Sequence, residues 1–280
     1  MSSPVANIFA AVAAANRNDP RRSGNVVHIE SGRTLIVAGD IHGNRANLDR
    51  ILRYADLRRC SERVLVLQEI IHGPPDEKSG ADRSVELLMR VARLQAELPG
   101  RIICLMGNHD LTQAGGAEIL KDGRGVCREF TAGVATAFGD DAPHVSEALN
   151  DLLLSFPLAV QTPGGAMVSH SLPTPGAQAP SDVLERSLTA DDFARGGAVY
   201  QWLWGRRQNR AQIEQLAQRL KVNFFVLGHR HMEGGFELFD PQAVALTSDT
   251  QHGCIIEFSS DEMLTAEAAQ ECIKPIALLG

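Results

Sequence analysis

The sequence predicts an α/β fold built from layers of sheet and helix. Short apolar runs that end in turns rich in glycine and polar residues are typical of buried strands, and four such runs are 35–38, 102–106, 166–168 and 224–227. Between the first two runs, apolar residues three or four positions apart indicate helices. This alternation of strand and helix is typical of layered α/β proteins.

The expected elements follow in chain order. Residues 26–29 and 34–38 flank Ser31-Gly32 and are expected to pair as a hairpin. Helical spacing then covers 48–57 and, after a strand at 63–67, a second helix is expected over 82–98. The later elements are helices at 146–154 and 210–220 and strands at 166–168, 224–227, 243–247 and 254–258.

Two long segments, at about 111–150 and 172–210, break this alternation. Each directly follows a polar cluster described below, so we interpret both as helical or loop insertions that wall the site and select the substrate. Residues 1–24 end in several helix breakers and are interpreted as a peripheral segment. The remainder, 25–280, is expected to form a single domain.

The composition argues against several classes of protein. The chain has 280 residues and a formal net charge of −7, which argues against nucleic acid as its main partner. Its five cysteines are odd in number and form no CxxC pair, which favours free thiols in a reducing compartment. No apolar run approaches the roughly 18 residues that span a bilayer, so no membrane partner is expected and a cytoplasmic location is predicted.

Four polar clusters stand where the apolar runs end. They are Gly39-Asp40-Ile41-His42-Gly43, Gly107-Asn108-His109-Asp110, Ser169-His170 and Gly228-His229-Arg230-His231. Functional groups gather at strand ends in layered α/β proteins, because the rigid sheet positions them and the loop leaves them open. Asp40 and His42, two positions apart after a strand, can face the same side, and His229 and His231 repeat this spacing.

The residue types in these clusters favour a metal site. Asn108 and His109 are adjacent, so one can coordinate a metal while the other faces substrate. Oxygen and nitrogen ligands without thiolates suit Mn, Fe, Zn or Co better than calcium. A structural histidine in the core or a loop is the ordinary alternative, and for His170 taken alone it is the commoner case. Four clusters that each follow a strand outweigh that alternative.

Together and in this order, the four clusters resemble the motifs of the calcineurin-like metallophosphoesterase superfamily. The resemblance covers about 33–260 and is nearest to the branch with the Ser/Thr protein phosphatases and the symmetrical dinucleoside tetraphosphate hydrolases. One helix–strand–helix fills the span between the first two clusters, and Leu203-Trp204-Gly205-Arg206 is similar to a Trp-containing segment of those enzymes. The resemblance implies a β-sandwich flanked by helices (αββα), with the two insertions around the site.

The resemblance also implies two divalent metal ions, drawn from Mn, Fe, Zn or Co. The ligands carried over by position are Asp40, His42 and His231 for one ion and Asn108, His170 and His229 for the other. Family members bridge the two ions with the Asp of a Gly-Asp motif. Here the strand runs into Gln68-Glu69, and Glu69 is the only acid in place for the bridge. Its extra methylene must be absorbed by the backbone or by the metal spacing.

A second departure from the family lies at His72-Gly73. The protein phosphatase branch has Asp-Arg-Gly at this point, where the Asp orients the catalytic His and the Arg grips phosphate. We interpret His72 as replacing one of these roles, with phosphate contact preferred; a plain loop histidine is the alternative. The arginine that clamps phosphate is expected among Arg45, Arg206 and Arg230, and Arg45 is preferred because it stands at the expected start of a helix.

The mechanism implied by the resemblance is metal-assisted hydrolysis of a phosphorylated substrate. A hydroxide that bridges the two ions attacks phosphorus in line, and His109 protonates the leaving oxygen as general acid, steadied by Asp40 or Asp110. The preferred function is a phosphomonoesterase for a phosphoprotein or a small phosphorylated metabolite. A phosphodiesterase or dinucleoside polyphosphate hydrolase stays open, as does a weakly active or inactive binding scaffold. The sequence leaves the substrate, the metals and the oligomeric state undetermined.

Overall fold

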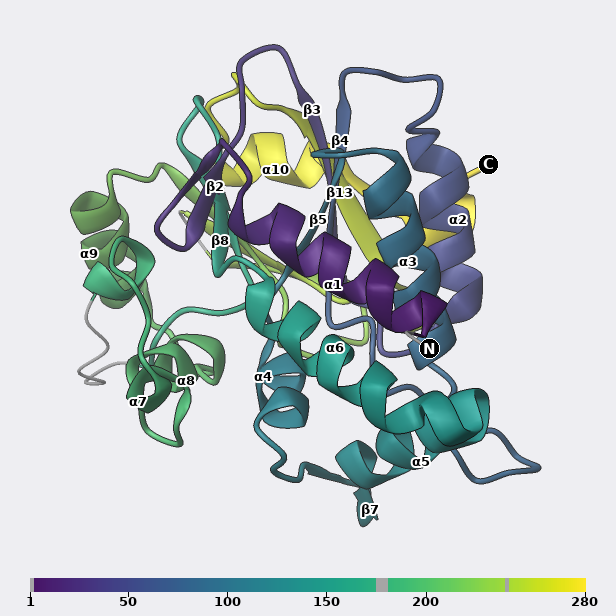
Figure 1. Ribbon diagram of the computed structural model, residues 1–280. Coiled ribbons are helices and arrows are strands. Elements are labelled where there is room, and N and C mark those ends of the chain that lie inside the picture. Colours follow the sequence, from purple (N-terminus) through teal and green to yellow (C-terminus); the bar gives the residue numbers. More distant parts are fainter. Residues whose placement is uncertain (1–2, 175–180, 240–241) are drawn as a thin grey trace.

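The computed structural model describes residues 3–174, 181–239 and 242–280. Within these residues, two β-sheets pack against each other and helices cover both outer faces (Figure 1). The smaller sheet contains, in spatial order, β14 (Ile273–Pro275), β13 (Cys254–Ser259), β3 (Thr34–Asp40), β4 (Arg63–Gln68) and β5 (Ile102–Leu105). The larger sheet contains β1 (Arg22–Ser23), β2 (Val26–His28), β8 (Ala159–Gln161), β9 (Ala166–Ser169), β10 (Phe224–Leu227), β12 (Ala243–Leu246) and β11 (Phe236–Phe239). The expected αββα layers are confirmed.

Alternating side chains explain why the two sheets pack together. Along β3, Leu35 and Val37 lie in the same apolar cluster as Val226 of the other sheet. The side chains between them, Ile36 and Ala38, belong to the cluster shared with the helices. Successive residues of a strand point to opposite faces, so a strand buried on both faces needs apolar residues at every position. This is why β3 appears in the sequence as a continuous apolar run.

The helices complete the outer layers. Figure 1 places α2 and α3 on one side of the molecule and α7, α8 and α9 on the other. Their bounds are α1 (Pro4–Arg17), α2 (Arg45–Ala55), α3 (Val85–Glu97), α4 (Asn108–Ala114), α5 (Val126–Phe138), α6 (Ala142–Ser155), α7 (Ala190–Phe193), α8 (Ala198–Leu203), α9 (Arg210–Leu220) and α10 (Ala266–Cys272). A small hairpin of β6 (Leu120–Lys121) and β7 (Arg124–Gly125) joins α4 to α5. No helix formed by the described residues has both the length and the apolar character needed to cross a bilayer.

The N-terminal segment, expected to be peripheral, is part of the core. Helix α1 packs against α6 and α3 (Figure 1), and its residues Phe9, Val12 and Ala13 are buried in the main apolar cluster. These three residues share one face of the helix because they are three or four positions apart. The sequence alone could not reveal the partner helix α6, which lies more than 120 residues further along the chain. Residues 1–2 lie outside the described residues.

The hairpin expected from 26–29 and 34–38 does not form. Strand β2 pairs in parallel with β8 in the larger sheet, whereas β3 pairs with β4 and β13 in the smaller one. The turn at Ser31-Gly32 therefore crosses from one sheet to the other. Turn residues such as Ser and Gly occur both in hairpins and in connections that cross between sheets, so the local sequence could not distinguish these two connections.

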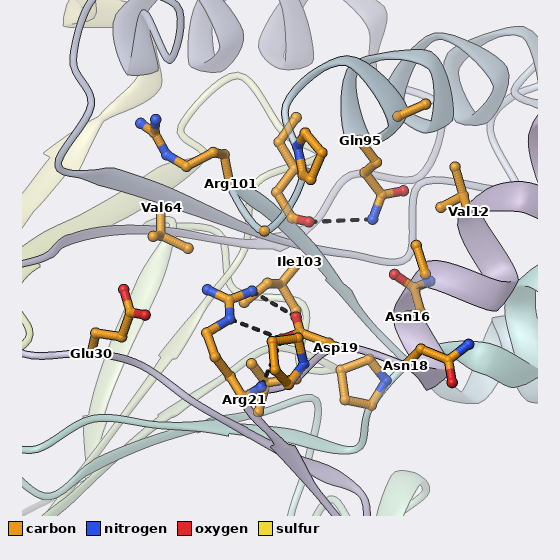
Figure 2. Close-up of a pocket in the computed structure, with 18 of the residues that line it drawn as sticks. Val12, Asn16, Asn18, Asp19, Arg21, Glu30, Val64, Gln95, Arg101 and Ile103 are labelled. Carbon is orange, nitrogen blue, oxygen red and sulfur yellow. Dashed lines mark hydrogen bonds and ion pairs between the residues drawn. The ribbon is translucent and has the colours of Figure 1, made fainter.

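A cavity of about 630 Å³ lies where β4 and β5 begin (Figure 2). Val64, Ile103 and residues of α1 line it, and Arg21 pairs with Asp19 at its wall. The carboxyl ends of β4 and β5 carry the polar clusters, so this cavity is at the opposite edge of the sheet. It is separate from the candidate site described next.

Candidate metal centre

The polar clusters meet at one edge of the sandwich. Strand β3 ends at Asp40, β4 ends directly before Glu69, and β9 ends directly before His170. An isolated backbone bridge between Asp40 and Thr247 links the two sheets at this edge. Because the carboxyl ends of neighbouring parallel strands lie side by side, residues distant in sequence converge here.

Glu69 occupies the centre of this cluster. Its Oε2 lies 3.4 Å from His42 Nε2, and its Oε1 lies 3.4 Å from His170 Nε2. Oε1 also accepts the backbone N–H of His109 at 2.7 Å. Two groups of side chains within the described residues are close enough to hold an ion, one of His42, Glu69 and His109 and one of Asp40, Glu69 and His170. The two groups share Glu69.

The remaining ligand candidates surround His170. Its Nε2 lies 2.9 Å from Asn108 Oδ1 and 3.0 Å from His229 Nδ1. The backbone N–H of His229 donates to both carboxylate oxygens of Asp40 at 3.1 Å, and His42 Nε2 lies 4.0 Å from Asp40 Oδ2. The structure therefore brings together six of the seven metal ligands predicted from the sequence.

The seventh, His231, makes no hydrogen bond or ion pair with this group among the described residues. Its side chain is exposed, and neither candidate ligand group includes it. The expectation that His229 and His231 face the same side assumed an extended backbone. Instead His229 has a φ of +66°, and the N–H of Arg230 donates to the carbonyl of Gly228 at 2.8 Å. This tight turn directs the two histidines differently, so the ligand role of His231 has no support from its position.

Two glycines of the motifs are required by crowding around the carboxylates. A Cβ added at Gly107 would lie 2.3 Å from Cγ of Glu69, and one at Gly228 would lie 2.6 Å from Oδ1 of Asp40. No real side chain tolerates such distances. Glycine at these positions therefore lets the backbone approach the ligands closely.

Gln68 is a site residue that the sequence reasoning missed. It is fully buried, and its Oε1 lies 3.3 Å from Nδ1 of His170 while its Nε2 donates to the carbonyl of Ala38 at 3.1 Å. A hydrogen bond to the outer nitrogen of a ligand histidine fixes the orientation of its ring. The signal in the sequence is that the buried strand ends in an amide side chain. In the sequence, Gln68 stands out only as a departure from the family's Gly-Asp motif.

His72 contacts the general-acid candidate, which corrects the preference for a phosphate contact. Its Nδ1 lies 2.7 Å from His109 Nδ1, and its Nε2 lies 2.9 Å from Gln113 Oε1. Both ring nitrogens are thus occupied, and the residue is 3 % exposed. Asp110, considered as a support for His109, instead accepts the backbone N–H of Gly107 at 2.9 Å in the first turn of α4.

One cation of the second insertion contacts the site, and one of the first insertion acts on it through its charge alone. Arg206, from the segment 172–210, donates from Nε to Nε2 of His229 at 3.0 Å. Lys121, from the β6–β7 hairpin of the segment 111–150, is close enough for its charge to act on Asp40 and His42. Lys121 is an exposed hairpin residue and had no signal in the sequence. Residues 175–180 of the second insertion lie outside the described residues.

The other two candidate arginines are engaged elsewhere. Arg45 pairs with Glu86 at 3.0 Å and its side chain is 55 % exposed, while Arg230 pairs with Glu237 at 3.3 Å. The preference for Arg45 as the phosphate clamp is therefore not supported by its position. Arg206 is the candidate arginine that touches a predicted ligand.

Burial dominates the electrostatics of the site. It raises the pKa of Asp40 and of Asp110 to about 7 each. It also raises the pKa of Glu69 well above its usual range, helped by the negative charges of Asp40 and Asp110. Burial lowers the pKa of His42 to about 4 and of His229 to about 3. The histidines are therefore neutral and able to bind a metal, while the carboxylates lack a compensating charge.

Comparisons with known proteins agree with this geometry. A family model described as calcineurin-like phosphoesterase matches residues 33–233. No curated protein matches the chain significantly. Among solved structures, a serine/threonine phosphatase from Saccharomyces cerevisiae is similar with a TM-score of 0.65 and 16 % identity, covering 90 % of this chain and 81 % of that one. A cold-active protein-tyrosine phosphatase of a psychrophilic Shewanella species is similar with a TM-score of 0.58 and 16 % identity, covering 89 % and 80 %.

These likenesses confirm the fold, and the family match covers most of the chain, including all four clusters. The chain belongs to the calcineurin-like phosphoesterase family and is a phosphoester hydrolase.

Proposed function

We propose that the protein is a metal-dependent phosphomonoesterase whose centre holds two divalent cations on either side of Glu69. The observation that carries this proposal is the position of the Glu69 carboxylate, with one oxygen beside His42 and the other beside His170. A carboxylate held between two sets of nitrogen and oxygen donors has the arrangement that a bridging ligand needs.

The donor set fits divalent cations. Buried carboxylates are costly unless they are paired with a positive charge, and burial raises the pKa of both Asp40 and Glu69. Asn108 Nδ2 is buried without a hydrogen-bond partner among the described residues, while its Oδ1 points to His170. An amide that ligates a metal does so through its oxygen, which agrees with this orientation.

The residues divide between two positions. Asp40 and His42 would hold one cation and Asn108, His170 and His229 the other, with Glu69 common to both. Bound cations of this kind stabilise charge on the phosphate and lower the pKa of a water molecule that attacks it. Mn, Fe, Zn or Co suits such a mixed set of donors.

The chain's own side chains handle the substrate. Arg206, which contacts His229, and Lys121, whose charge acts on Asp40, are proposed to bind the phosphate oxygens. His109, the neighbour of Asn108, is proposed to donate a proton to the leaving oxygen. Two cationic side chains besides the metals favour a dianionic monoester over a singly charged diester.

The similar structures are described as protein phosphatases, which is consistent with a phosphoprotein substrate. A small phosphorylated metabolite fits the same chemistry. We propose a phosphomonoester of either kind as the substrate.

The test is metal content by elemental analysis, combined with hydrolysis of p-nitrophenyl phosphate and bis(p-nitrophenyl) phosphate in Mn²⁺. We expect about two metal ions per chain and faster hydrolysis of the monoester. Asp40→Asn should abolish turnover, and His144→Ala, at an exposed position on α6, serves as the matched control. Preference for the diester would replace the proposal with a phosphodiesterase. Metal-free protein without turnover would favour the binding scaffold.

A further inference from the structure

We infer that His72 is a positioning residue: it holds the ring of His109 in the tautomer that keeps a proton on Nδ1 and leaves Nε2 to serve the substrate. This inference rests on the proposed function for its catalytic meaning, but its geometric core can be tested without activity. It assigns to a neutral histidine the orienting task that an aspartate performs in the protein phosphatases that the sequence resembles.

The first step is that one hydrogen joins the two histidines. The Nδ1 atoms of His72 and His109 are 2.7 Å apart, which is hydrogen-bond distance. In such a contact one nitrogen must donate the hydrogen and the other must accept it. The direction of this bond therefore decides which nitrogen of His109 carries its proton.

A chain of contacts behind His72 fixes that direction. Thr131 donates its hydroxyl hydrogen to the carbonyl of Cys127 at 2.9 Å, so its oxygen is available as an acceptor. Gln113 donates to that oxygen from Nε2 at 3.3 Å. This assigns the other end of the Gln113 amide, Oε1, as the atom that faces His72 Nε2 at 2.9 Å. Because a carbonyl oxygen only accepts, His72 must carry its proton on Nε2.

The consequence for His109 follows directly. With its proton on Nε2, a neutral His72 presents a bare Nδ1, and burial favours the neutral form by lowering the pKa of His72 to about 4. His109 must then donate from its own Nδ1. Its remaining nitrogen, Nε2, is the one that His72 does not occupy.

A strained backbone and several contacts fix the position of His72. It has a φ of +64°, a left-handed conformation that is costly for a residue with a side chain. The next residue, Gly73, donates its N–H to the buried carboxylate of Asp82 at 3.0 Å, which holds the loop. The His72 ring also meets Phe130 of α5 edge-on, with centroids 5.5 Å apart. A loop histidine without a role needs no such support.

In the reaction, the bond between phosphorus and the leaving oxygen breaks and its electron pair stays on that oxygen. Nε2 of His109, which is bare in the resting enzyme, first takes up a proton from solvent and then passes it to the leaving oxygen. The attacking water supplies the new oxygen on phosphorus and releases a proton to solvent. His109 keeps its Nδ1 proton throughout, donated to His72. The side chain of His72 thus acts only through His109.

A set of substitutions separates this role from a structural one. Asparagine places its amide group near the former Nδ1, and glutamine places its amide group near the former Nε2. His72→Asn therefore retains an acceptor for His109, whereas His72→Gln retains only the contact with Gln113, and His72→Phe retains neither. We expect kcat to follow the order wild type, Asn variant, then the Gln and Phe variants.

The readout is kcat for two aryl monoesters in the Mn²⁺-loaded enzyme. Phenyl phosphate has a leaving group that needs protonation, and p-nitrophenyl phosphate has one that needs it less. His72→Phe should lower kcat for phenyl phosphate by about 100-fold, the scale of general-acid catalysis, with a smaller loss for p-nitrophenyl phosphate and little change in KM. In a His109→Ala background the same substitution should have no further effect.

Equal losses for both esters, or an undiminished loss in the His109→Ala background, would overturn the inference and leave His72 a packing residue. So would a Gln variant as active as the Asn variant.

A second measurement does not depend on turnover. Nitrogen-15 NMR of the histidine rings in the Zn²⁺-loaded protein should show His109 with its proton on Nδ1. The His72→Asn variant should keep this preference, and the His72→Gln and His72→Phe variants, which lack the acceptor, should lose it. A resting His109 protonated on Nε2 would overturn the inference. If the wild type hydrolyses no ester, the proposed function fails, and the NMR result still decides the role of His72.

Discussion

At the scale of single residues, backbone strain marks the site. Four residues with side chains adopt positive φ around the carboxylates: His42 at +39°, Glu69 at +39°, His72 at +64° and His229 at +66°. Such conformations cost about 1–3 kcal/mol each and persist where the surrounding structure over-determines them. At Glu69 the positive φ falls directly after the end of β4.

Glu69→Gln should weaken metal binding and raise the stability of the metal-free protein. The folded-state pKa of Glu69 is raised above its unfolded value, so the native apoprotein loses stability as the pH rises between the two. Glutamine keeps the size and the Oε1 acceptor but removes the charge. We expect the apoprotein in EDTA to gain about 1–4 kcal/mol at pH 9, a rise of several degrees in Tm, and little gain near pH 4.

Thermal unfolding with and without Mn²⁺ checks this prediction. The variant should also lose the stabilisation by Mn²⁺ that the wild type shows. A variant that is less stable in EDTA at pH 9, yet still stabilised by Mn²⁺, would contradict the assignment of Glu69.

Arg206 and Arg45 should differ in their effect on turnover. Arg206→Ala removes a guanidinium that contacts His229 and is expected to lower kcat/KM for p-nitrophenyl phosphate by about tenfold or more. Arg45→Ala breaks only an exposed pair with Glu86 and should leave kcat/KM within about twofold. Steady-state kinetics of both variants at one ionic strength decides the matter. The reverse order would restore Arg45 as the phosphate clamp.

At the scale of secondary-structure elements, the insertions and the N-terminal helix have separate tasks. The β6–β7 hairpin carries Lys121, whose charge acts on Asp40, and the segment after α8 carries Arg206, which contacts His229. Helix α1 instead packs on α6 and contributes buried apolar surface. The elements near the chemistry thus differ from those that stabilise the core, so substitutions in α1 test the fold without touching the site.

Phe9→Ala should destabilise the protein without changing its chemistry. Phe9 of α1 is fully buried in the main apolar cluster. Truncation of a buried Phe lowers the free energy of unfolding by about 3–5 kcal/mol. Leu154→Ala, at a 36 % exposed position of α6, is the matched control and should cost less than about 1 kcal/mol. Urea unfolding monitored by circular dichroism measures both. A loss below about 1 kcal/mol for Phe9→Ala would mean that α1 is peripheral after all.

At the scale of the whole molecule, the two sheets act as a rigid frame for the proposed metal ligands. Asp40, His42 and Glu69 come from the smaller sheet and His170 and His229 from the larger one. The apolar interface between the sheets therefore sets the distance between the two halves of the site. Rigid strands fix such positions better than loops do, which favours a preformed metal site.

Metal uptake by the whole protein should depend steeply on pH. Cations bind the ionised carboxylates, and burial raises the pKa of Asp40 to about 7, so a proton must leave when the ion enters. The affinity for Mn²⁺ should rise between pH 6 and pH 7 by about tenfold for each proton displaced and level off above the pKa values of the carboxylates. Calorimetry in two buffers with different ionisation heats counts the released protons. An affinity that is constant with pH would contradict the raised pKa values.

Much of the candidate site was predictable because its proposed ligands follow strands. Each buried strand is a continuous apolar run, and the polar residues directly after it are visible as a motif; this located Asp40, His42, Asn108, His170 and His229. The layered fold follows from the same runs and from helical periodicity. These properties are local, so they can be read from neighbouring residues in the chain.

Tertiary structure decided the rest because the remaining features depend on contacts between distant segments. His72 reaches His109 across 37 positions, and α1 finds its partner α6 much further along the chain. Arg206, in the loop after α8, lies beside the predicted ligand His229, whereas Arg45 pairs with Glu86. A tight turn after Gly228 separates His231 from His229 despite their favourable spacing. Sequence patterns identify which groups can act, but only the packed chain determines which of them meet.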